Sequence, residues 1–185
     1  ARRTGAALHL QHLGTSALHD MKQVLAEIDR CRAEGMDVTA EVYPYTVAST
    51  LLESAFFNEG WRENLGIDYG DVAWAATGER LTKESFDRYR KQGGWALIYL
   101  MKDADVDQAI THPGVMIASD GLPFVKGKGH PRGAGTFARV LGHYSRERGL
   151  LPLMTALEKM TILPARRLEA HVPAMKAKGR IALGA

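Results

Sequence analysis

The sequence predicts an α/β protein in which strands and helices alternate around a mainly parallel sheet. Residues 6–13 and 37–43 have strand character and are separated by one amphipathic helix, and such a strand-helix-strand unit normally belongs to a parallel sheet. A further apolar run, residues 114–118, ends in Ser119-Asp120-Gly121. This run predicts a buried strand with a carboxylate at its carboxyl end, where chemistry takes place in a barrel of alternating strands and helices.

The amino-terminal unit begins with a strand over residues 6–13 that carries His12 at its carboxyl end. Thr15 or Ser16 can cap the helix that follows, and Gly35 is expected to end it. The apolar side chains of this helix share one face at helical spacing: Met21, Val24, Leu25, Ile28 and Cys31. Residues 37–43 are rich in β-branched side chains and predict the next strand, which Pro44 closes.

From residue 50 to residue 94 the pattern loosens, with aromatic side chains scattered among glycines and charges. The clearest helix in this stretch covers residues 81–92 and is opened by Thr82. Because long structureless loops are uncommon in compact domains, an excursion of this length is usually a lid or an inserted subdomain. We therefore expect one barrel-like unit over residues 1–185 with a lid-like insertion at residues 51–94.

The strands and helices resume after the insertion. Residues 95–101 are a strand candidate, and residues 103–111 predict a helix capped by Asp103. Pro113 then breaks the chain before the Ser-Asp-Gly strand. Four strand candidates result, and the sequence leaves open which of them lies outside the barrel wall.

A glycine-rich loop, residues 125–135, follows Asp120. It lacks the order of glycines, lysine and serine or threonine that a phosphate-binding loop requires. Helices are then expected over residues 136–148 and 151–161, with a short one from Pro164 to residue 170. In the first of these helices four side chains are expected to point inward: Phe137, Val140, Leu141 and Tyr144.

The composition limits the function classes. The chain has 185 residues, enough for one domain, and a net charge of +3 without a dense basic run, so nucleic acid is not an expected partner. The one cysteine gives no disulfide and no cysteine-rich zinc site, which fits a cytoplasmic location. No apolar stretch is long enough for a membrane span. Both ends lie within recognisable patterns, so we expect further elements on either side; the oligomeric state is left open.

His12 and Asp120 are the main candidates for chemistry. Both sit at strand ends that converge in a barrel, so a shared metal ion is one interpretation. The alternative is structural: a histidine bonded to a backbone carbonyl and an aspartate that caps its own loop. Two ligands do not make a zinc site, which normally has three. His9, three residues before His12, faces the opposite side of the strand and is expected to be structural.

Three further side chains are candidates for binding a ligand. Tyr43 and Ser49 lie just past a strand end and could present hydroxyl groups, although packing is the alternative role. Arg132 follows His130-Pro131 in a turn near Asp120, and its guanidinium would suit a carboxylate substrate; an exposed loop arginine is the alternative.

Several runs of the chain resemble the N-acyl-D-amino-acid deacylases (D-aminoacylases) of the amidohydrolase superfamily. They keep the order and spacing of that family across almost the whole chain, at residues 11–13, 41–50, 119–123, 130–132, 136–142, 160–168 and 178–181. The resemblance implies the carboxyl-terminal part of a metal-dependent (β/α)₈ barrel, with its last three strands and helices present and a long loop inserted over the site.

By this resemblance, His12 would be the metal-ligand histidine of the sixth barrel strand. Asp120 would be the aspartate of the eighth strand, a catalytic residue that takes the proton of the attacking water and hands it to the leaving amine, and also a metal ligand. Tyr43, Ser49 and Arg132 match positions that bind the carboxylate of an N-acyl amino acid substrate. The implied cofactor is Zn²⁺, one or two ions in the complete enzyme.

Two positions depart from the family pattern, and part of the family's metal shell lies outside this sequence. Gly14 stands where the family has a lysine that helps to hold the carboxylate, and Glu41 stands where aspartate is more usual. The first-strand His-x-His pair, the cysteine ligand and the fifth-strand histidine would lie before Ala1. We therefore expect the isolated chain to be inactive. The alternatives are another amidohydrolase reaction, such as cyclic amide or dipeptide hydrolysis, and a non-catalytic α/β protein.

Overall fold

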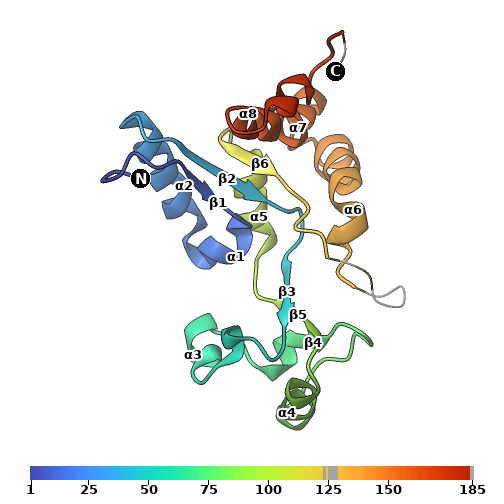
Figure 1. Cartoon of the computed structure of the whole chain (residues 1–185). Coiled ribbons are helices and arrows are strands. Elements are labelled where there is room, and N and C mark those ends of the chain that lie inside the picture. Colours follow the sequence, from blue (N-terminus) through green and yellow to red (C-terminus); the bar gives the residue numbers. More distant parts are fainter. Residues whose placement is uncertain (123, 125–128, 184–185) are drawn as a thin grey trace.

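The computed structural model describes residues 1–122, 124 and 129–183, and within them the chain forms two three-stranded sheets (Figure 1). The first sheet is parallel, in the order β1-β2-β6, and consists of β1 (Leu8–Leu10), β2 (Val38–Val42) and β6 (Val115–Ile117). The second is antiparallel, in the order β3-β5-β4, and consists of β3 (Val47–Leu51), β4 (Val72–Trp74) and β5 (Trp95–Tyr99). In Figure 1 the second sheet lies below the first.

The strand-helix-strand unit predicted at the amino terminus is confirmed. Helix α1 (Leu13–Ala17), the short 3₁₀ helix η1 (Leu18–Asp20) and helix α2 (Met21–Ala33) connect β1 to β2, and the two strands pair in parallel. Gly35 has φ of 81°, a left-handed conformation that glycine adopts without a steric penalty, and the chain leaves α2 there as expected.

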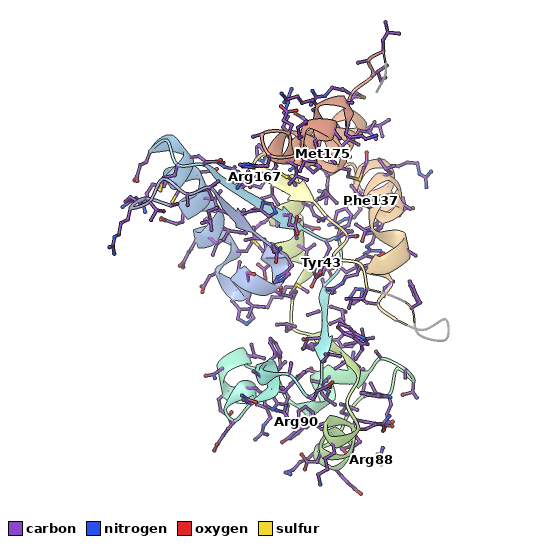
Figure 2. The ribbon with its side chains drawn as sticks, in the orientation of Figure 1. Tyr43, Arg88, Arg90, Phe137, Arg167 and Met175 are labelled. Carbon is purple, nitrogen blue, oxygen red and sulfur yellow. The ribbon has the colours of Figure 1, made fainter. Side chains whose placement is uncertain are left out.

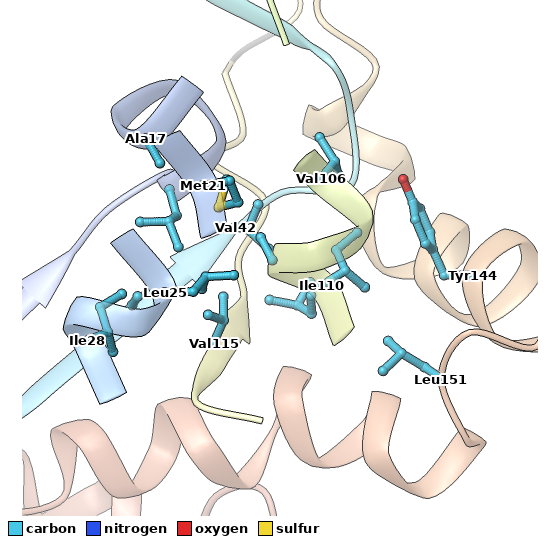
Figure 3. Close-up of a cluster of buried hydrophobic side chains, with 14 of the residues drawn as sticks. Ala17, Met21, Leu25, Ile28, Val42, Val106, Ile110, Val115, Tyr144 and Leu151 are labelled. Atoms are coloured by element: carbon cyan, nitrogen blue, oxygen red, sulfur yellow. The ribbon is translucent and has the colours of Figure 1, made fainter. Parts of the chain in front are cut away.

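Alternation along β2 places the main core on one face of the parallel sheet. Val38, Ala40 and Val42 are buried there, whereas Thr39 and Glu41 point to the opposite face and are only partly buried. The buried side chains of α2 pack on the first face together with those of α5 (Asp103–Thr111), as Figure 3 shows for Met21, Leu25, Ile28, Val106 and Ile110. Fully burying one such side chain stabilises the fold by about 1.5 to 3 kcal/mol.

The second sheet contains elements that the sequence pattern did not indicate. Strand β3 was not predicted, and the strand predicted over residues 95–101 is β5, which pairs with β3 and β4 and lies outside the parallel sheet. Four short helices accompany this sheet: η2 (Ala55–Phe57), α3 (Trp61–Leu65), η3 (Tyr69–Asp71) and α4 (Lys83–Gln92).

Helix α4 begins as the sequence predicts, because Thr82 and Ser85 form a capping box at its amino end. A cluster of aromatic side chains holds the helices of this region together. Trp61 stacks on Phe86 at a centroid distance of 5.4 Å, and Phe57 meets both rings edge to face. The buried cluster to which these rings belong also contains Ala48, Ala96, Ile98 and Leu100 from outside residues 51–94.

The carboxyl-terminal part is helical, with α6 (Arg132–Arg139), the π-helical η4 (Val140–Glu147), α7 (Leu153–Met160), α8 (Ile162–Leu168) and the 3₁₀ helix η5 (Pro173–Ala177). Val140 and Tyr144 are buried and Leu141 packs against the core, as predicted. Phe137 is instead 47% exposed, because the buried side chains of this stretch follow a spacing of four residues, at Thr136, Val140 and Tyr144, which leaves Phe137 outside the buried face.

Three further local predictions are wrong. Neither Thr15 nor Ser16 caps a helix, because both lie within α1, whose amino-terminal cap residue is His12. Asp103 does not cap α5, because the residue at the cap is Lys102 and no side chain bonds there. Pro164 does not open its helix but is the third residue of α8. Residues 125–128 of the glycine-rich loop lie outside the described residues.

The barrel prediction holds in part. Three parallel strands with their helices are present, but the sheet of the described residues is open, with β1 and β6 as its two edges. No helix among the residues described is long and apolar enough to cross a membrane.

Two cations join the elements at the amino-terminal edge of the parallel sheet. Arg32 of α2 donates to the carbonyl oxygens of Val38 and Gly114, each at 2.7 Å. Lys159 of α7, which is buried, donates to the carbonyl oxygens of His112 and Val115. Burial lowers the pKa of Lys159 to about 8.

We expect Lys159→Ala to lower the free energy of unfolding in urea by about 2 to 4 kcal/mol, because it removes the hydrogen bonds from a buried ammonium group to two carbonyl oxygens and opens a cavity beneath β6. Lys22→Ala, on the exposed side of α2, is the matched control and should change stability by less than about 0.5 kcal/mol. Equal effects of the two substitutions would show that Lys159 does not hold α7 to the sheet.

Candidate functional site

A cavity of about 180 Å³ lies where the parallel sheet meets the second sheet. Its polar wall comes from residues that follow the parallel strands: His12 and Thr15 after β1, Tyr43 after β2, and Asp120 and Arg132 after β6. The opposite wall comes from the second sheet and η2: Ala48, Ser49, Thr50, Phe56, Ile98 and Leu100. Figure 2 shows Tyr43 in the middle of the molecule, close to the start of the second sheet.

All five residues proposed from the sequence line this cavity: His12, Tyr43, Ser49, Asp120 and Arg132. The parallel pairing explains why three of them meet, since the carboxyl ends of parallel strands lie at one edge of the sheet. Their roles in catalysis or binding remain predictions. The contacts within the cavity show which atoms of each side chain are already engaged.

Arg132 is paired with Asp120 rather than exposed in a loop. Its Nη2 lies 3.0 Å from Oδ2 of Asp120, and the arginine side chain is only 3% exposed, against 33% for the aspartate. Arg132 Nε is buried and has no hydrogen-bond partner among the described residues. The pair therefore combines a nearly buried cation, with one donor unused, and a carboxylate that solvent can reach.

Tyr43 packs against this arginine. The guanidinium carbon of Arg132 lies 4.6 Å from the centre of the Tyr43 ring, a cation–π arrangement. Burial raises the pKa of Tyr43 to about 12, so its hydroxyl keeps its proton at neutral pH. Within the part of the chain described, this buried hydroxyl has no hydrogen-bond partner. A neutral donor thus lies beside the cation.

Ser49 is less available than its position suggests. Its hydroxyl donates to the carbonyl oxygen of Ala96 on β5 at 2.9 Å. A hydroxyl has one proton to donate, so Ser49 can offer a ligand only its lone pairs while this bond exists.

His12 and Asp120 both adopt left-handed backbone conformations, with φ of 35° and 45°. Such conformations are uncommon for residues other than glycine and cost of the order of 1 kcal/mol or more each. Of the three described non-glycine residues with positive φ, two therefore lie in this cavity. Backbone strain at these two positions is typical of a site that holds particular side chains in fixed orientations.

His130 is a residue of the site that the sequence did not single out. It is 2% exposed, and its Nδ1 accepts the backbone N–H of Arg132 at 3.0 Å. Its Nε2 therefore carries the proton and donates to the carbonyl oxygen of Val47, at 2.8 Å. His130 thus joins β3 to the start of α6 and fixes the backbone of Arg132.

His9 lies outside the cavity, on the other face of β1, where a structural role was expected. Its Nδ1 is 2.7 Å from Oγ1 of Thr39 and its Nε2 is 3.0 Å from Glu41. Both nitrogens are thus bonded within the sheet.

The donor atoms of the cavity fit part of a zinc site. Histidine nitrogen and carboxylate oxygen are both common zinc ligands. The residues that the structure describes contain no cluster of three or more histidine, cysteine, aspartate or glutamate side chains that could hold a metal ion. His12 and Asp120 could therefore supply two ligands, and the described chain does not complete the shell.

Comparison with known proteins gives the family. No family model matches the chain. An N-acyl-D-glutamate deacylase from Alcaligenes xylosoxydans xylosoxydans is 36% identical over 198 aligned residues, which cover 100% of this chain and 38% of that protein. A D-aminoacylase from the same organism is 35% identical over 170 residues, covering 86% of this chain and 34% of its own length.

Solved structures show similarity to the same kinds of protein. A crystal structure of D-aminoacylase, described as defining a novel subset of amidohydrolases, matches 92% of this chain and 37% of its own, with a TM-score of 0.70 and 32% identity. N-acyl-D-glutamate deacylase from Bordetella bronchiseptica, complexed with zinc and a phosphonate mimic of the tetrahedral intermediate, covers 89% of this chain and 36% of its own, with a TM-score of 0.72 and 32% identity.

The fold thus matches part of the D-aminoacylase structure, which is described as an amidohydrolase. Over the segment it spans, the chain is a homologue of D-aminoacylases and N-acyl-D-amino-acid deacylases, which confirms the resemblance seen in the sequence. It spans only 38% of the length of the first of these relatives and 34% of the second.

The buried imidazole of His130 predicts a loss of stability in acid. Burial lowers its pKa to about 4, whereas an unfolded histidine titrates near 6.5. Between these values the unfolded chain binds more protons than the folded one, so the free energy of unfolding falls as pH decreases from about 6.5 to about 4. Since one pKa unit corresponds to about 1.4 kcal/mol, we expect a loss on the order of 2 kcal/mol from this residue.

His130→Gln should remove that part of the pH dependence, because an amide can still bond Val47 but does not titrate. The measurement is urea unfolding of both proteins between pH 4 and pH 7. His19→Gln, at an exposed position, is the control and should leave the curve unchanged. Parallel pH curves for the parent and His130→Gln would contradict the assignment.

Proposed function

We propose that this chain forms the substrate-anchoring and proton-transfer part of a metal-dependent hydrolase that cleaves the amide bond of N-acyl-D-amino acids. The observation that carries the proposal is that His12 and Asp120, from the ends of two different strands, line one cavity together with Arg132 and Tyr43. The names of the relatives supply the reaction: they are deacylases of N-acyl-D-glutamate and N-acyl-D-aspartate, and a D-aminoacylase.

His12 and Asp120 would hold the zinc ion, with the remaining ligands supplied from outside the described residues. When bound, zinc supplies a lowered pKa for a coordinated water and a polarised amide carbonyl. Asp120 takes the proton from the attacking water and passes it to the leaving amine, as a general base and then a general acid. Because Arg132 pairs with Oδ2 of Asp120, we assign this transfer to Oδ1.

Arg132 and Tyr43 anchor the carboxylate of the substrate. Each keeps a buried donor, Nε and the phenolic hydroxyl, that is unpartnered in the described chain, and a carboxylate would satisfy both. Ser49 contributes to the shape of the cavity and can offer the substrate only the lone pairs of its hydroxyl oxygen, because its proton is bonded to the carbonyl oxygen of Ala96. Anchoring at this end holds the scissile carbonyl in a fixed position relative to Asp120, which lowers the entropic cost of reaction.

Residues 51–94 would act as the lid. Phe56 from this region lines the cavity opposite His12, beside Ile98 and Leu100 from β5 and the segment after it. This apolar wall would exclude water from the bound amide and strengthen the electrostatic interactions on the polar side.

One observation favours a second candidate, the hydrolysis of cyclic amides or dipeptides. Gly14 lies against Met101, and a Cβ atom at this position would come within 2.7 Å of Sδ of Met101. The side chain of Met101 would therefore have to move to admit the lysine that the family pattern has there. A cyclic amide has no free carboxylate and would not need that cation, whereas a dipeptide still carries one, so the observation favours the cyclic amide of these two.

The chain alone should release no D-amino acid from N-acetyl-D-leucine or N-acetyl-D-glutamate, with or without added zinc, because its described ligands do not complete a metal shell. Zinc-dependent release by this chain alone would contradict the proposal that it supplies only part of the site.

A chimera tests the function itself. We expect activity when this chain replaces the matching 38% of the N-acyl-D-glutamate deacylase, assayed on N-acyl-D-amino acids, a cyclic amide and a dipeptide. Asp120→Ala in the chimera should lower kcat by a factor of about 10² to 10⁴, the usual contribution of a general acid–base group. Asp87→Ala, an exposed carboxylate on α4, is the control and should retain full activity.

A folded chimera that contains zinc and hydrolyses none of the N-acyl-D-amino acids would overturn the proposed substrate class. Activity only on the cyclic amide or the dipeptide would select the second candidate.

A further inference from the structure

The ring of His12 is held by two hydroxyl groups of the helix that follows it. Oγ1 of Thr15 lies 2.8 Å from Nδ1 of His12, and Oγ of Ser16 lies 3.4 Å from the same nitrogen. Thr15 also lines the cavity, beside His12. The hydrogen bonds that the described residues make to this imidazole are all made at Nδ1.

The direction of these bonds follows from what else the hydroxyls contact. Oγ1 of Thr15 donates to the carbonyl oxygen of His12 at 2.9 Å, and Oγ of Ser16 donates to the carbonyl oxygen of Gln11 at 3.1 Å. A hydroxyl has one proton, and a carbonyl oxygen can only accept. Each hydroxyl has therefore used its proton on the backbone and can offer Nδ1 only a lone pair.

A proton on Nδ1 removes the competition for the hydroxyl proton of Thr15. If Nδ1 were unprotonated, Thr15 Oγ1 would have two acceptors within 2.9 Å and one proton for both. Protonated Nδ1 satisfies every contact at once. In a neutral imidazole the second nitrogen, Nε2, then holds the free electron pair.

We propose that Thr15, assisted by Ser16, is a positioning residue that fixes His12 as the Nδ1–H tautomer and so directs the electron pair of Nε2 to the cavity. The inference rests on the proposed function in one respect, since it identifies Nε2 as the atom with which His12 would bind zinc. Hydrogen bonds of this kind, from the second nitrogen of a ligating histidine, orient the ring and its tautomer in metal sites.

The backbone supports the same arrangement. His12 has φ of 35° and ψ of 59° at the start of α1, and its carbonyl oxygen accepts both the N–H of Thr15 and the hydroxyl of Thr15, each at 2.9 Å. The contacts of one threonine therefore hold the main chain and the imidazole of His12 together. This pairing compensates for the strain of a left-handed histidine.

Long-range ¹H–¹⁵N NMR of the full chain labelled at histidine tests the tautomer directly. The signals of His12 are assigned by their loss in His12→Gln, and spectra are recorded at a pH where the ring is neutral. We expect the parent to show protonated Nδ1 and unprotonated Nε2. Thr15→Val, which keeps the shape and removes the hydroxyl, should shift the population toward the Nε2–H form, and Thr15→Val with Ser16→Ala should shift it further.

Thr15→Ser is the matched control, because it keeps a hydroxyl at the same place and should retain the Nδ1–H form. Circular dichroism and the dispersion of backbone amide signals show that each variant is folded. An Nε2–H tautomer in the folded parent, or the same tautomer in the parent and in folded Thr15→Val with Ser16→Ala, would overturn the proposal.

Titration of the metal-free chimera described above, carrying each Thr15 variant, with Zn²⁺ alone gives a second readout that separates this inference from the proposed function. Loss of a bond to the second nitrogen typically weakens metal binding by about 10- to 100-fold, so Thr15→Val should bind zinc at least about tenfold more weakly than Thr15→Ser. If zinc binds but Thr15→Val and Thr15→Ser bind it equally, the positioning role is wrong. If no variant binds zinc while the NMR result holds, the positioning role stands and the metal assignment of the proposed function fails.

Discussion

The parallel pairing of β2 with strands on both of its sides is the constraint on which the site depends. Leu10 of β1 lies opposite Ala40, and Val42 lies opposite Ile117 of β6. The segments that leave these three strands therefore emerge at one edge of the sheet. A shift of one residue in either pairing would exchange the two faces of a strand. The same register therefore both buries the valines of β2 and places the polar cavity at its end.

The parts of the fold that could be predicted from the sequence are those with local signals. The periodicity of α2, the capping pair of α4 and the apolar runs of β2 and β6 lie within single elements. The second sheet could not be predicted in the same way, because β4 has three residues and β3 is defined by its pairing with β5, more than forty positions away. The stacking of Trp61 on Phe86 is likewise a tertiary contact between residues whose order in the chain gives no period.

The candidate site shows the same division. His12, Tyr43 and Asp120 could be identified because each follows a strand, and all three line the cavity. The ion pair of Asp120 with Arg132 and the bridge made by His130 could not, since both depend on the path of the glycine-rich loop, which no periodicity describes. The His-Pro-Arg run was part of the family pattern, but a buried histidine that bonds only backbone atoms leaves no separate signal in a single sequence.

The bridge at His130 has a consequence for how the two sheets can vary. One imidazole connects a carbonyl on β3 to the amide of Arg132, so an insertion or a change of register in the second sheet displaces the arginine that faces Asp120. Transplanting only the β3–β5 region from a relative would thus alter the charged wall of the cavity without touching its residues. The second sheet and the first turn of α6 are therefore structurally coupled, and they should be exchanged together in any chimera of this chain with a relative.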